Sequence, residues 1–236
     1  MTDAIFSAAA GNRLLGALPP DVLGQLLPKM RSVPLVTRDV VYGADAEIDA
    51  VYFPLSGWVS MVAALADGDQ AEVGIIGREG MVGLPLLHGV AVSFEEAMVQ
   101  GPGTALRLEA AAFSQALDEL PALRGLLLRY SMAQQSQVTQ TAACNGNHDL
   151  EQRLSRWLLM AHDRADGAEF SMTHSFLALM LCTHRPSVTV AARILQRANL
   201  IRYGSGSITV LDRPGLEAAS CECYRIVRRR FEQLLG

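Results

Sequence analysis

The sequence is poor in cysteine and has no long apolar run. Only four cysteines occur in 236 residues, at Cys144, Cys182, Cys221 and Cys223. They are too few for a disulfide scaffold in a chain of this size. No apolar run reaches the roughly 18 residues that a membrane helix needs, and the first residues lack the pattern of a signal peptide. We therefore expect a cytoplasmic protein with free thiols and no membrane partner.

Lysine is almost absent, and the charges are unevenly distributed. Lys29 is the only lysine among the 20 basic residues. Residues 1–150 carry 8 basic and 16 acidic residues, a net charge of −8, whereas residues 151–236 carry 12 and 8, a net charge of +4. Arginine makes forked contacts with phosphate and guanine. The two parts of the chain are therefore predicted to have different partners.

Signatures of catalysis and of metal binding are also missing. No Ser/His/Asp set or carboxylate pair stands out, and the run from Gly77 to Gly83 lacks the GK[ST] ending of a phosphate-binding loop. The five histidines are scattered without ligand spacing. Cys221 and Cys223 supply at most two of the four ligands that zinc requires. We predict a protein that is not an enzyme and has no cofactor or metal.

The segment from residue 33 to residue 108 alternates short β-rich runs with turn signals. Seven such runs occur, at 33–36, 40–42, 50–53, 58–63, 71–76, 97–99 and 104–108. Short strands separated by Gly, Pro and Asp turns are typical of a small antiparallel barrel or roll. With an apolar helical stripe over residues 11–31, they predict a β-roll domain over residues 1–120.

Residues 121–146 are predicted to form one long helix. Pro121 opens the stretch, and only Gly125 interrupts it before residues 145–146. One face follows the 3,4 spacing of a two-stranded coiled coil. The predicted dimer interface consists of Leu123, Leu126, Tyr130, Ala133 and Gln137. The same spacing also fits a helix packed on its own domain.

The pattern of residues 147–236 predicts a winged helix-turn-helix. A helix over residues 148–162 precedes two short helices, over 173–181 and 186–198, that are joined by a tight turn. A glycine-rich link at residues 204–206 then connects two strands.

The second short helix carries the candidate contacts with DNA. Its first polar side chains would face base edges, and neighbouring arginines would face phosphates. The predicted DNA-binding residues are His184, Arg185, Ser187, Thr189, Arg193, Arg197 and Arg202, with Arg213 as a further phosphate contact. Arg185 is expected to bind guanine, whose O6 and N7 accept a forked guanidinium.

Several motifs in this order are informative together. They are the segment RPSVTVAARILQRANLI (185–201), the motif DRPGL (212–216), and the runs VYFPLSG (51–57) and GREGMVG (77–83). With these motifs the chain resembles the CRP/FNR family of bacterial transcription regulators. The resemblance implies an α+β fold with a cyclic-nucleotide-binding-like antiparallel β-roll as sensor, a long dimerisation helix and a C-terminal winged helix-turn-helix.

Two departures from the family pattern bear on recognition. Pro186 and Val190 stand where the family's recognition helix carries Glu and a second Arg, so the DNA site should differ. Leu84 and Glu95-Glu96 match the places of the ribose-binding Glu and the phosphate-binding Arg. Because carboxylates repel a phosphate, cyclic AMP should not bind. The candidate effector pocket consists of Gly83, Leu84, Glu95, Glu96, Gln137 and Thr141.

The resemblance implies a homodimer that binds double-stranded DNA at a palindromic site. An unknown small-molecule effector and RNA polymerase are further candidate partners. The family's iron–sulfur sensors need an N-terminal cysteine cluster, and no cysteine precedes Cys144. Two alternatives stay open: a roll that binds no ligand and only builds the dimer, and a cyclic-nucleotide sensor module that acts through protein contacts.

Overall fold

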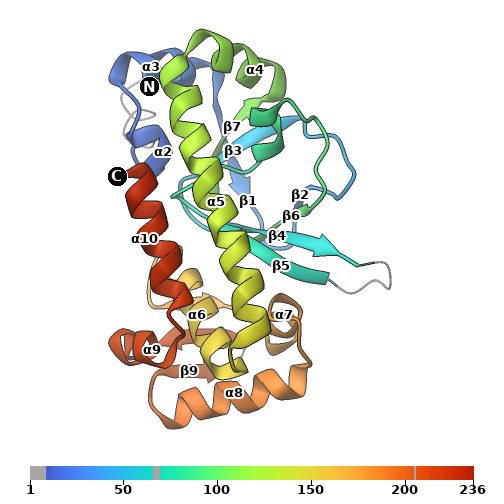
Figure 1. Cartoon of the computed structure of the whole chain (residues 1–236), viewed down its shortest axis with the longest axis vertical. Helices are drawn as coiled ribbons and strands as arrows, with labels where there is room; N and C mark the ends of the chain where they lie inside the picture. Colours follow the sequence, from blue (N-terminus) through green and yellow to red (C-terminus); the bar gives the residue numbers. More distant parts are fainter. Residues whose placement is uncertain (1–8, 66–69, 205) are drawn as a thin grey trace.

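A long helix connects a β-roll with a smaller C-terminal module (Figure 1). The structure is a computed structural model that describes residues 9–65, 70–204 and 206–236. Among these residues no helix has both the length and the apolar character needed to cross a membrane. The α+β fold predicted from the sequence is confirmed.

The roll contains a strand at each of the seven predicted runs. Its strands are β1 (Arg31–Leu35), β2 (Val40–Tyr42), β3 (Ala50–Pro54), β4 (Trp58–Ala64), β5 (Gln70–Ile76), β6 (Glu96–Gly101) and β7 (Gly103–Glu109). They form two antiparallel sheets, in the orders β1-β7-β3 and β2-β6-β4-β5. The short helices are α2 (Arg13–Gly16), α3 (Pro20–Leu26), η1 (Leu27–Lys29) and η2 (Leu84–His88).

Three helices cover one side of the roll. They are α4 (Ala110–Glu119), α5 (Pro121–Asn147) and α10 (Cys223–Leu235). Helix α10 runs antiparallel along α5 (Figure 1), and its Val227 and Phe231 share a core with Leu123 and Tyr130. The predicted domain over residues 147–236 includes α10, but this helix packs against α5 and the roll, because its apolar face is buried there.

The C-terminal module is a winged helix-turn-helix. Its elements are α6 (Leu150–His162), β8 (Glu169–Ser171), α7 (His174–Met180), α8 (Arg185–Arg197), β9 (Ile201–Gly204), β10 (Ser207–Val210) and α9 (Arg213–Ala219). Asp149 and Gln152 cap α6 reciprocally. The wing sheet has the order β8-β10-β9, and β8 is a strand that the sequence analysis did not predict.

Side chains from both modules interlock where they meet. The rings of Trp58 and Phe170 pack edge to face with centroids 5.9 Å apart. Trp157 Nε1 donates a hydrogen bond to Glu72 Oε1 at 2.8 Å. Both contacts are buried, so the winged helix is docked on the roll in this conformation.

Candidate nucleic-acid interface and effector cavity

Helix α8 presents one face to the outside at the lower edge of the molecule (Figure 1). Pro186 lies in its first turn, where a missing N–H costs nothing. Val188, Ala191, Ala192 and Leu195 are buried, and α8 packs against α6 and α7. The remaining positions of α8 therefore face away from the protein, as a recognition helix requires.

Five of the predicted DNA contacts are exposed on this face and on the wing. They are His184, Arg185, Arg193, Arg197 and Arg202. No Asp or Glu occurs between residues 170 and 211, and none of these four arginines has an ion-pair partner in the described residues. Uncompensated positive charge over one face is the electrostatic pattern of a surface that binds DNA phosphates.

Thr189 is turned into the protein, contrary to the predicted contact with a base. Its hydroxyl donates to the carbonyl of Arg185 at 3.0 Å and lies 3.0 Å from His174 Nδ1. The His174 ring stacks on Tyr203 with centroids 3.9 Å apart. Burial, together with the charges of Arg185 and Arg193, lowers the pKa of His174. Thr189 therefore joins α7 to α8 rather than contacting DNA.

Two apolar side chains on the outer face of α8 were not identified as site residues. Val190 is 55% exposed and Ile194 is 45% exposed, whereas the predicted Ser187 is half-buried. Apolar side chains in the major groove can contact the methyl group of thymine. The spacing of the buried positions could have revealed that Val190 points outward.

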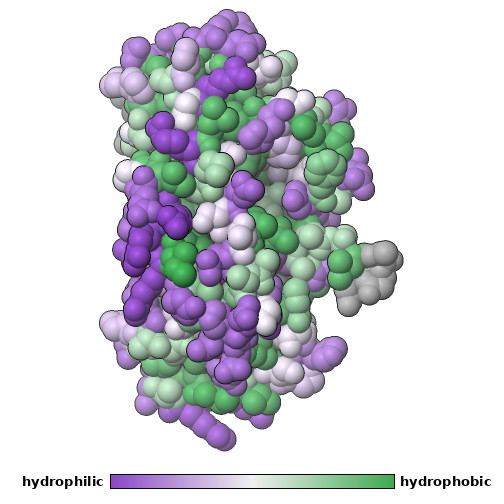
Figure 2. All heavy atoms as spheres, in the orientation of Figure 1, coloured by the Kyte–Doolittle hydropathy of each residue, from purple (hydrophilic) through white to green (hydrophobic). Residues whose placement is uncertain are grey.

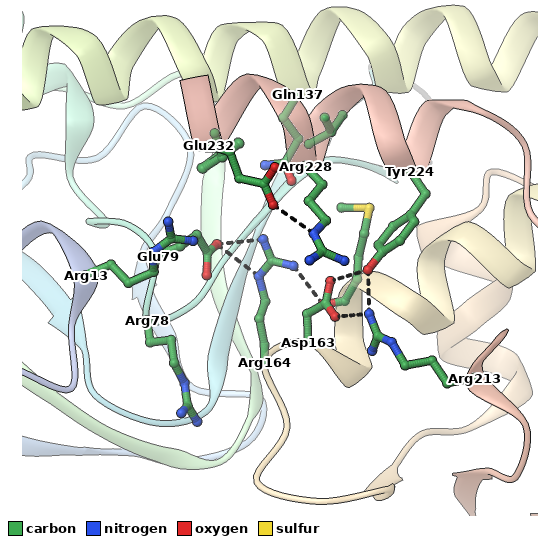
Figure 3. A pocket seen from close by; sticks show the side chains of 13 residues that line it. Arg13, Arg78, Glu79, Gln137, Asp163, Arg164, Arg213, Tyr224, Arg228 and Glu232 are labelled. Carbon is green, nitrogen blue, oxygen red and sulfur yellow. Dashed lines mark hydrogen bonds and ion pairs between the residues drawn. The ribbon is translucent and has the colours of Figure 1, made fainter. Parts of the chain in front are cut away.

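Arg213 lies in a network of side chains within the chain, and these partners compete with its predicted phosphate contact. Its guanidinium contacts Asp163 Oδ1 at 2.6 Å and Tyr224 Oη at 2.6 Å (Figure 3). It also contacts Glu217 Oε1 at 3.1 Å. With His162 Nδ1 at 2.7 Å from its Nη1, four side chains surround this guanidinium. Arg213 therefore fastens α9 to α6 and α10.

A cavity of about 450 Å³ between the roll, α6 and α10 is rich in arginine (Figure 3). Within it Arg164 Nη2 lies 2.6 Å from Glu79 Oε1, and Arg228 Nε lies 3.0 Å from Glu232 Oε1. In these two ion pairs the positive charge of each guanidinium is neutralised by a carboxylate of the same chain. The cavity is a polar joint between the modules, and an anionic ligand would have to displace these partners.

A second cavity, of about 370 Å³, lies between the roll and α5. Apolar side chains form most of its wall: Met61, Val73, Ile76, Leu84, Val90, Phe94 and Val138. Ser131, Gln134 and Gln135 of α5 add polar groups, and Glu95 supplies a carboxylate. No Lys or Arg is among its described lining residues. Gln134 is 6% exposed, and its Nε2 has no hydrogen-bond partner among the described residues.

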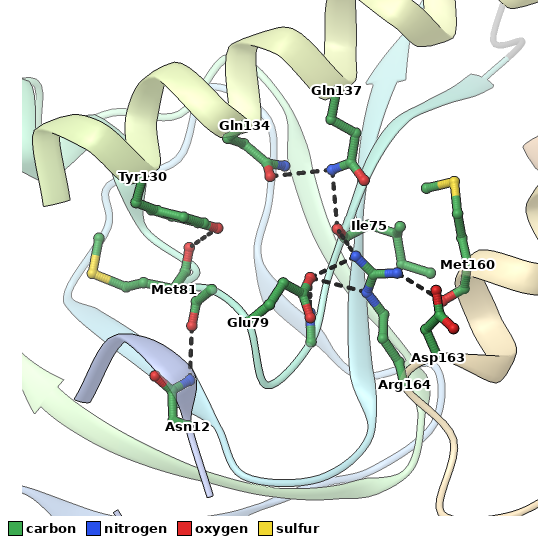
Figure 4. Close-up of polar contacts among 12 residues, drawn as sticks. Asn12, Ile75, Glu79, Met81, Tyr130, Gln134, Gln137, Met160, Asp163 and Arg164 are labelled. Carbon is green, nitrogen blue, oxygen red and sulfur yellow. Dashed lines mark hydrogen bonds and ion pairs between the residues drawn. The ribbon is translucent and has the colours of Figure 1, made fainter. Parts of the chain in front are cut away.

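Only three of the six residues of the predicted effector pocket line this cavity. Gly83, Leu84 and Glu95 line the second cavity, whereas the remaining three predicted residues do not. Gln137 Nε2 donates to the carbonyl of Ile75 at 3.1 Å (Figure 4), Thr141 accepts a hydrogen bond from Arg156, and Glu96 lies outside the wall. On α5 the cavity is lined by Ser131, Gln134, Gln135 and Val138 instead, and Ser131 contacts His88 of η2.

The predicted dimer interface is buried within the chain. Leu123, Leu126, Tyr130, Ala133 and Gln137 are at most 4% exposed. The Tyr130 hydroxyl donates to the carbonyl of Met81 at 3.0 Å (Figure 4), and burial raises the pKa of Tyr130. These residues cannot meet a second copy without opening the core. The alternative of a helix packed on its own domain therefore describes this face.

A different heptad stripe of α5 is exposed. Its residues follow one another at 4,3,4,3 spacing and differ from those of the predicted interface. They are Leu128, Met132, Gln135, Thr139 and Ala142. Leu128 is 46% exposed and Met132 is 55% exposed. On the side of the molecule that Figure 2 shows, apolar and polar side chains alternate along α5 beside the strongly hydrophilic α10.

Family models match both modules of the chain. Residues 33–119 match the cyclic nucleotide-binding domain, and residues 152–219 match the Crp-like helix-turn-helix domain. Together these models cover the roll and the winged helix in the order that the structure shows. The chain belongs to the CRP/FNR family of transcription regulators.

Solved structures of CRP/FNR proteins share the fold at low sequence identity. FixK2 from Bradyrhizobium japonicum is 15% identical with a TM-score of 0.69, over 81% of this chain and 98% of that chain. A CRP-family regulator from Thermus thermophilus is 22% identical with a TM-score of 0.66, over 80% and 96%. The c-di-GMP responsive regulator CLP from Xanthomonas campestris is 15% identical with a TM-score of 0.61, over 82% and 100%. No match was found among curated protein sequences.

Proposed function

We propose that this CRP/FNR-family regulator is a homodimer that binds a palindromic DNA site through two copies of α8. The exposed arginines of α8 and the wing, in a segment without acidic residues, carry the proposal. A mobility-shift assay over a range of salt concentrations tests it, because each phosphate contact should contribute a slope of about −0.9 to log affinity against log salt. A winged helix that acted only through protein contacts would give no salt-dependent shift.

The exposed stripe of α5 is the proposed dimer interface. Its apolar residues Leu128 and Met132 would pack against their copies, and the small Ala142 would allow the helices to approach closely. A two-fold axis along α5 would place the two α8 helices at successive major grooves, about 34 Å apart. A signal at the roll would then act by shifting the population of dimers with this spacing. Contact with RNA polymerase also stays a prediction.

Arg185 is expected to determine one base pair of each half-site. If its guanidinium forks onto guanine, Arg185→Ala should cost about 1–3 kcal/mol per half-site and relax the preference at that position. Selection of binding sites from random DNA, compared between the wild type and the variant, measures this effect. An unchanged base preference would assign Arg185 to the DNA backbone.

Arg202→Ala on the wing is the matched comparison. Arg202 is exposed on β9, and a phosphate contact there carries no sequence information. Its loss should weaken binding to all sequences alike and reduce the salt slope by about one unit. The two variants together separate base recognition from electrostatic binding.

The cavity between the roll and α5 favours an effector without phosphate groups. Its wall is mostly apolar, with amide and hydroxyl groups from α5, the imidazole of His88 and the carboxylate of Glu95, and a phosphate would meet no guanidinium or ammonium group there. CLP of Xanthomonas campestris is described as c-di-GMP responsive; a dinucleotide of that kind carries two negative charges. We propose instead an uncharged or cationic, largely apolar small molecule.

Cyclic AMP should therefore not bind at physiological concentrations. Titration calorimetry of the full chain with cyclic AMP and with cyclic di-GMP should give no saturable heat. A micromolar dissociation constant for either nucleotide would contradict this prediction. Failure of every apolar candidate to bind would favour a roll that only builds the dimer.

A further inference from the structure

Four metal-ligating side chains from distant parts of the sequence meet below the long helix. Cys144 lies near the end of α5, His148 follows that helix, and Cys221 and Cys223 lie where α9 leads into α10. One ligand atom from each residue lies within 4.8 Å of the other three. The sequence pattern predicts no metal, because Cys221 and Cys223 supply only two ligands and the histidines lack ligand spacing. The fold brings Cys144 and His148 to the same place.

We propose that these four residues bind a zinc ion in a closed Cys₃His site. Zinc bonds of about 2.3 Å to sulfur and about 2.0–2.1 Å to nitrogen give a tetrahedron whose edges are about 3.8 Å between sulfurs and about 3.6 Å between sulfur and nitrogen. The Sγ atoms of Cys144 and Cys221 lie 3.5 Å apart. Cys223 Sγ lies 3.6 Å from His148 Nδ1. Both distances agree with these edges within a few tenths of an ångström.

The surroundings of the cluster also suit a metal. The three cysteines are buried. His148 directs Nδ1 toward Cys223, while its Nε2 lies 3.3 Å from Glu222 Oε2. A carboxylate on the far nitrogen of a ligating histidine fixes the ring orientation and increases its basicity. Gln140 Nε2 donates to Cys223 Sγ at 3.1 Å, which would stabilise a thiolate. The outer contacts of a structural zinc site are thus present.

The composition and size of the site favour zinc over other centres. Three thiolates and one imidazole are soft ligands that suit zinc in a tetrahedral arrangement. Four protein ligands leave no open position for catalysis. An iron–sulfur cluster would need its ligands farther apart, because several irons and sulfides would lie between them. A disulfide between Cys144 and Cys221 would use only two of the four groups.

The position of the site indicates what the metal would do. It would join the end of α5 to the start of α10, where the chain passes between the roll and the winged helix. Metal binding would therefore strengthen the connection between the modules. This inference does not rest on the proposed effector or DNA site, since the metal content of the protein is measured without either.

The experiment uses the full chain purified under reducing conditions without chelators. Elemental analysis should find about one zinc per chain. Replacement of zinc by Co²⁺ should give the visible bands of a tetrahedral ion and a near-ultraviolet charge-transfer band from thiolates. Cys144→Ser and Cys221→Ser should lose most of the metal and most of the charge-transfer band. Cys182→Ser is the control: Cys182 lies outside the cluster, in the turn between α7 and α8, so this variant should retain the metal.

Three results would each overturn the proposal. The first is a reduced protein that contains no zinc and shows no thiolate band with Co²⁺. The second is a Cys144–Cys221 disulfide, identified by mass spectrometry without reductant, in a protein that does not take up metal after reduction. If a cysteine variant is insoluble, His148→Ala and Glu222→Gln provide the test, through loss of zinc and weaker Co²⁺ binding respectively. Retention of full metal affinity by His148→Ala would also contradict the Cys₃His assignment.

Discussion

Met132→Glu should convert the proposed dimer into a folded monomer. Met132 is 55% exposed on the stripe of α5 that we propose as the dimer interface. In the dimer two glutamates would be buried near the two-fold axis, at a cost of about 3–5 kcal/mol. The dimer dissociation constant should therefore rise roughly a hundredfold to several thousandfold. Sedimentation velocity measures this change, and circular dichroism verifies that the monomer is folded.

Two variants serve as controls for this prediction. Val36 is 52% exposed on the roll, so Val36→Glu places the same charge on a comparable apolar site and should leave the dimer intact. Leu126 is 4% exposed within the core of the chain, so Leu126→Glu should unfold the protein instead of separating the subunits. An unchanged dimer for Met132→Glu would show that the subunits meet elsewhere.

Glu72→Gln should remove a pH dependence of stability. Glu72 is buried where the roll meets α6, and it accepts hydrogen bonds from Ser60 and from Trp157. Burial raises the pKa of this carboxyl to about 7, although the nearby Arg156 and Arg164 oppose the shift. Between about pH 4.5 and pH 7 the folded state therefore binds more protons than the unfolded state, and the free energy of unfolding falls as the pH rises.

Denaturant unfolding at pH 5 and at pH 8 measures the effect. The raised pKa predicts that Glu72 alone lowers the free energy of unfolding by about 2.5 kcal/mol between these values. Other groups titrate as well, so the quantity to compare is the difference between wild type and Glu72→Gln at each pH. Glu47→Gln, at an exposed site on the roll, is the control. If wild type and Glu72→Gln differed by the same free energy of unfolding at both pH values, the raised pKa of Glu72 would be contradicted.

The sequence predicts the elements of the fold well because their signals are local. Turn residues separate all seven strands of the roll, and Pro186 together with the buried spacing of α8 defines the recognition helix. Strand β8 of the wing sheet has only three residues, which is too short for a recognisable alternation of apolar and polar side chains. It forms because β10 offers it a partner.

The proposed dimer interface and the cysteine cluster depend on contacts that the sequence does not reveal. The apolar heptad of Leu123 and Tyr130 is real, but α10 and the roll cover it. The apolar face of α10 gave no indication of its partner. Cys144 and Cys221 are 77 positions apart, and only the antiparallel packing of α5 and α10 brings them together. The contacts of Arg213 could not be predicted for a similar reason, since its carboxylate partner Asp163 directly follows α6 and lies 50 positions earlier in the sequence.

The return of α10 along α5 has a mechanical consequence. The chain enters the winged helix after α5 and leaves it before α10, and these two crossings lie side by side, with Cys144 and Cys221 3.5 Å apart at the sulfurs. Two adjacent crossings act together as one hinge between the modules. They permit flexion about the line that joins them and resist torsion about the long axis of the molecule. In the proposed dimer, rotation of the winged helix about this line would therefore change both the distance between the two recognition helices and the angle at which each enters its groove.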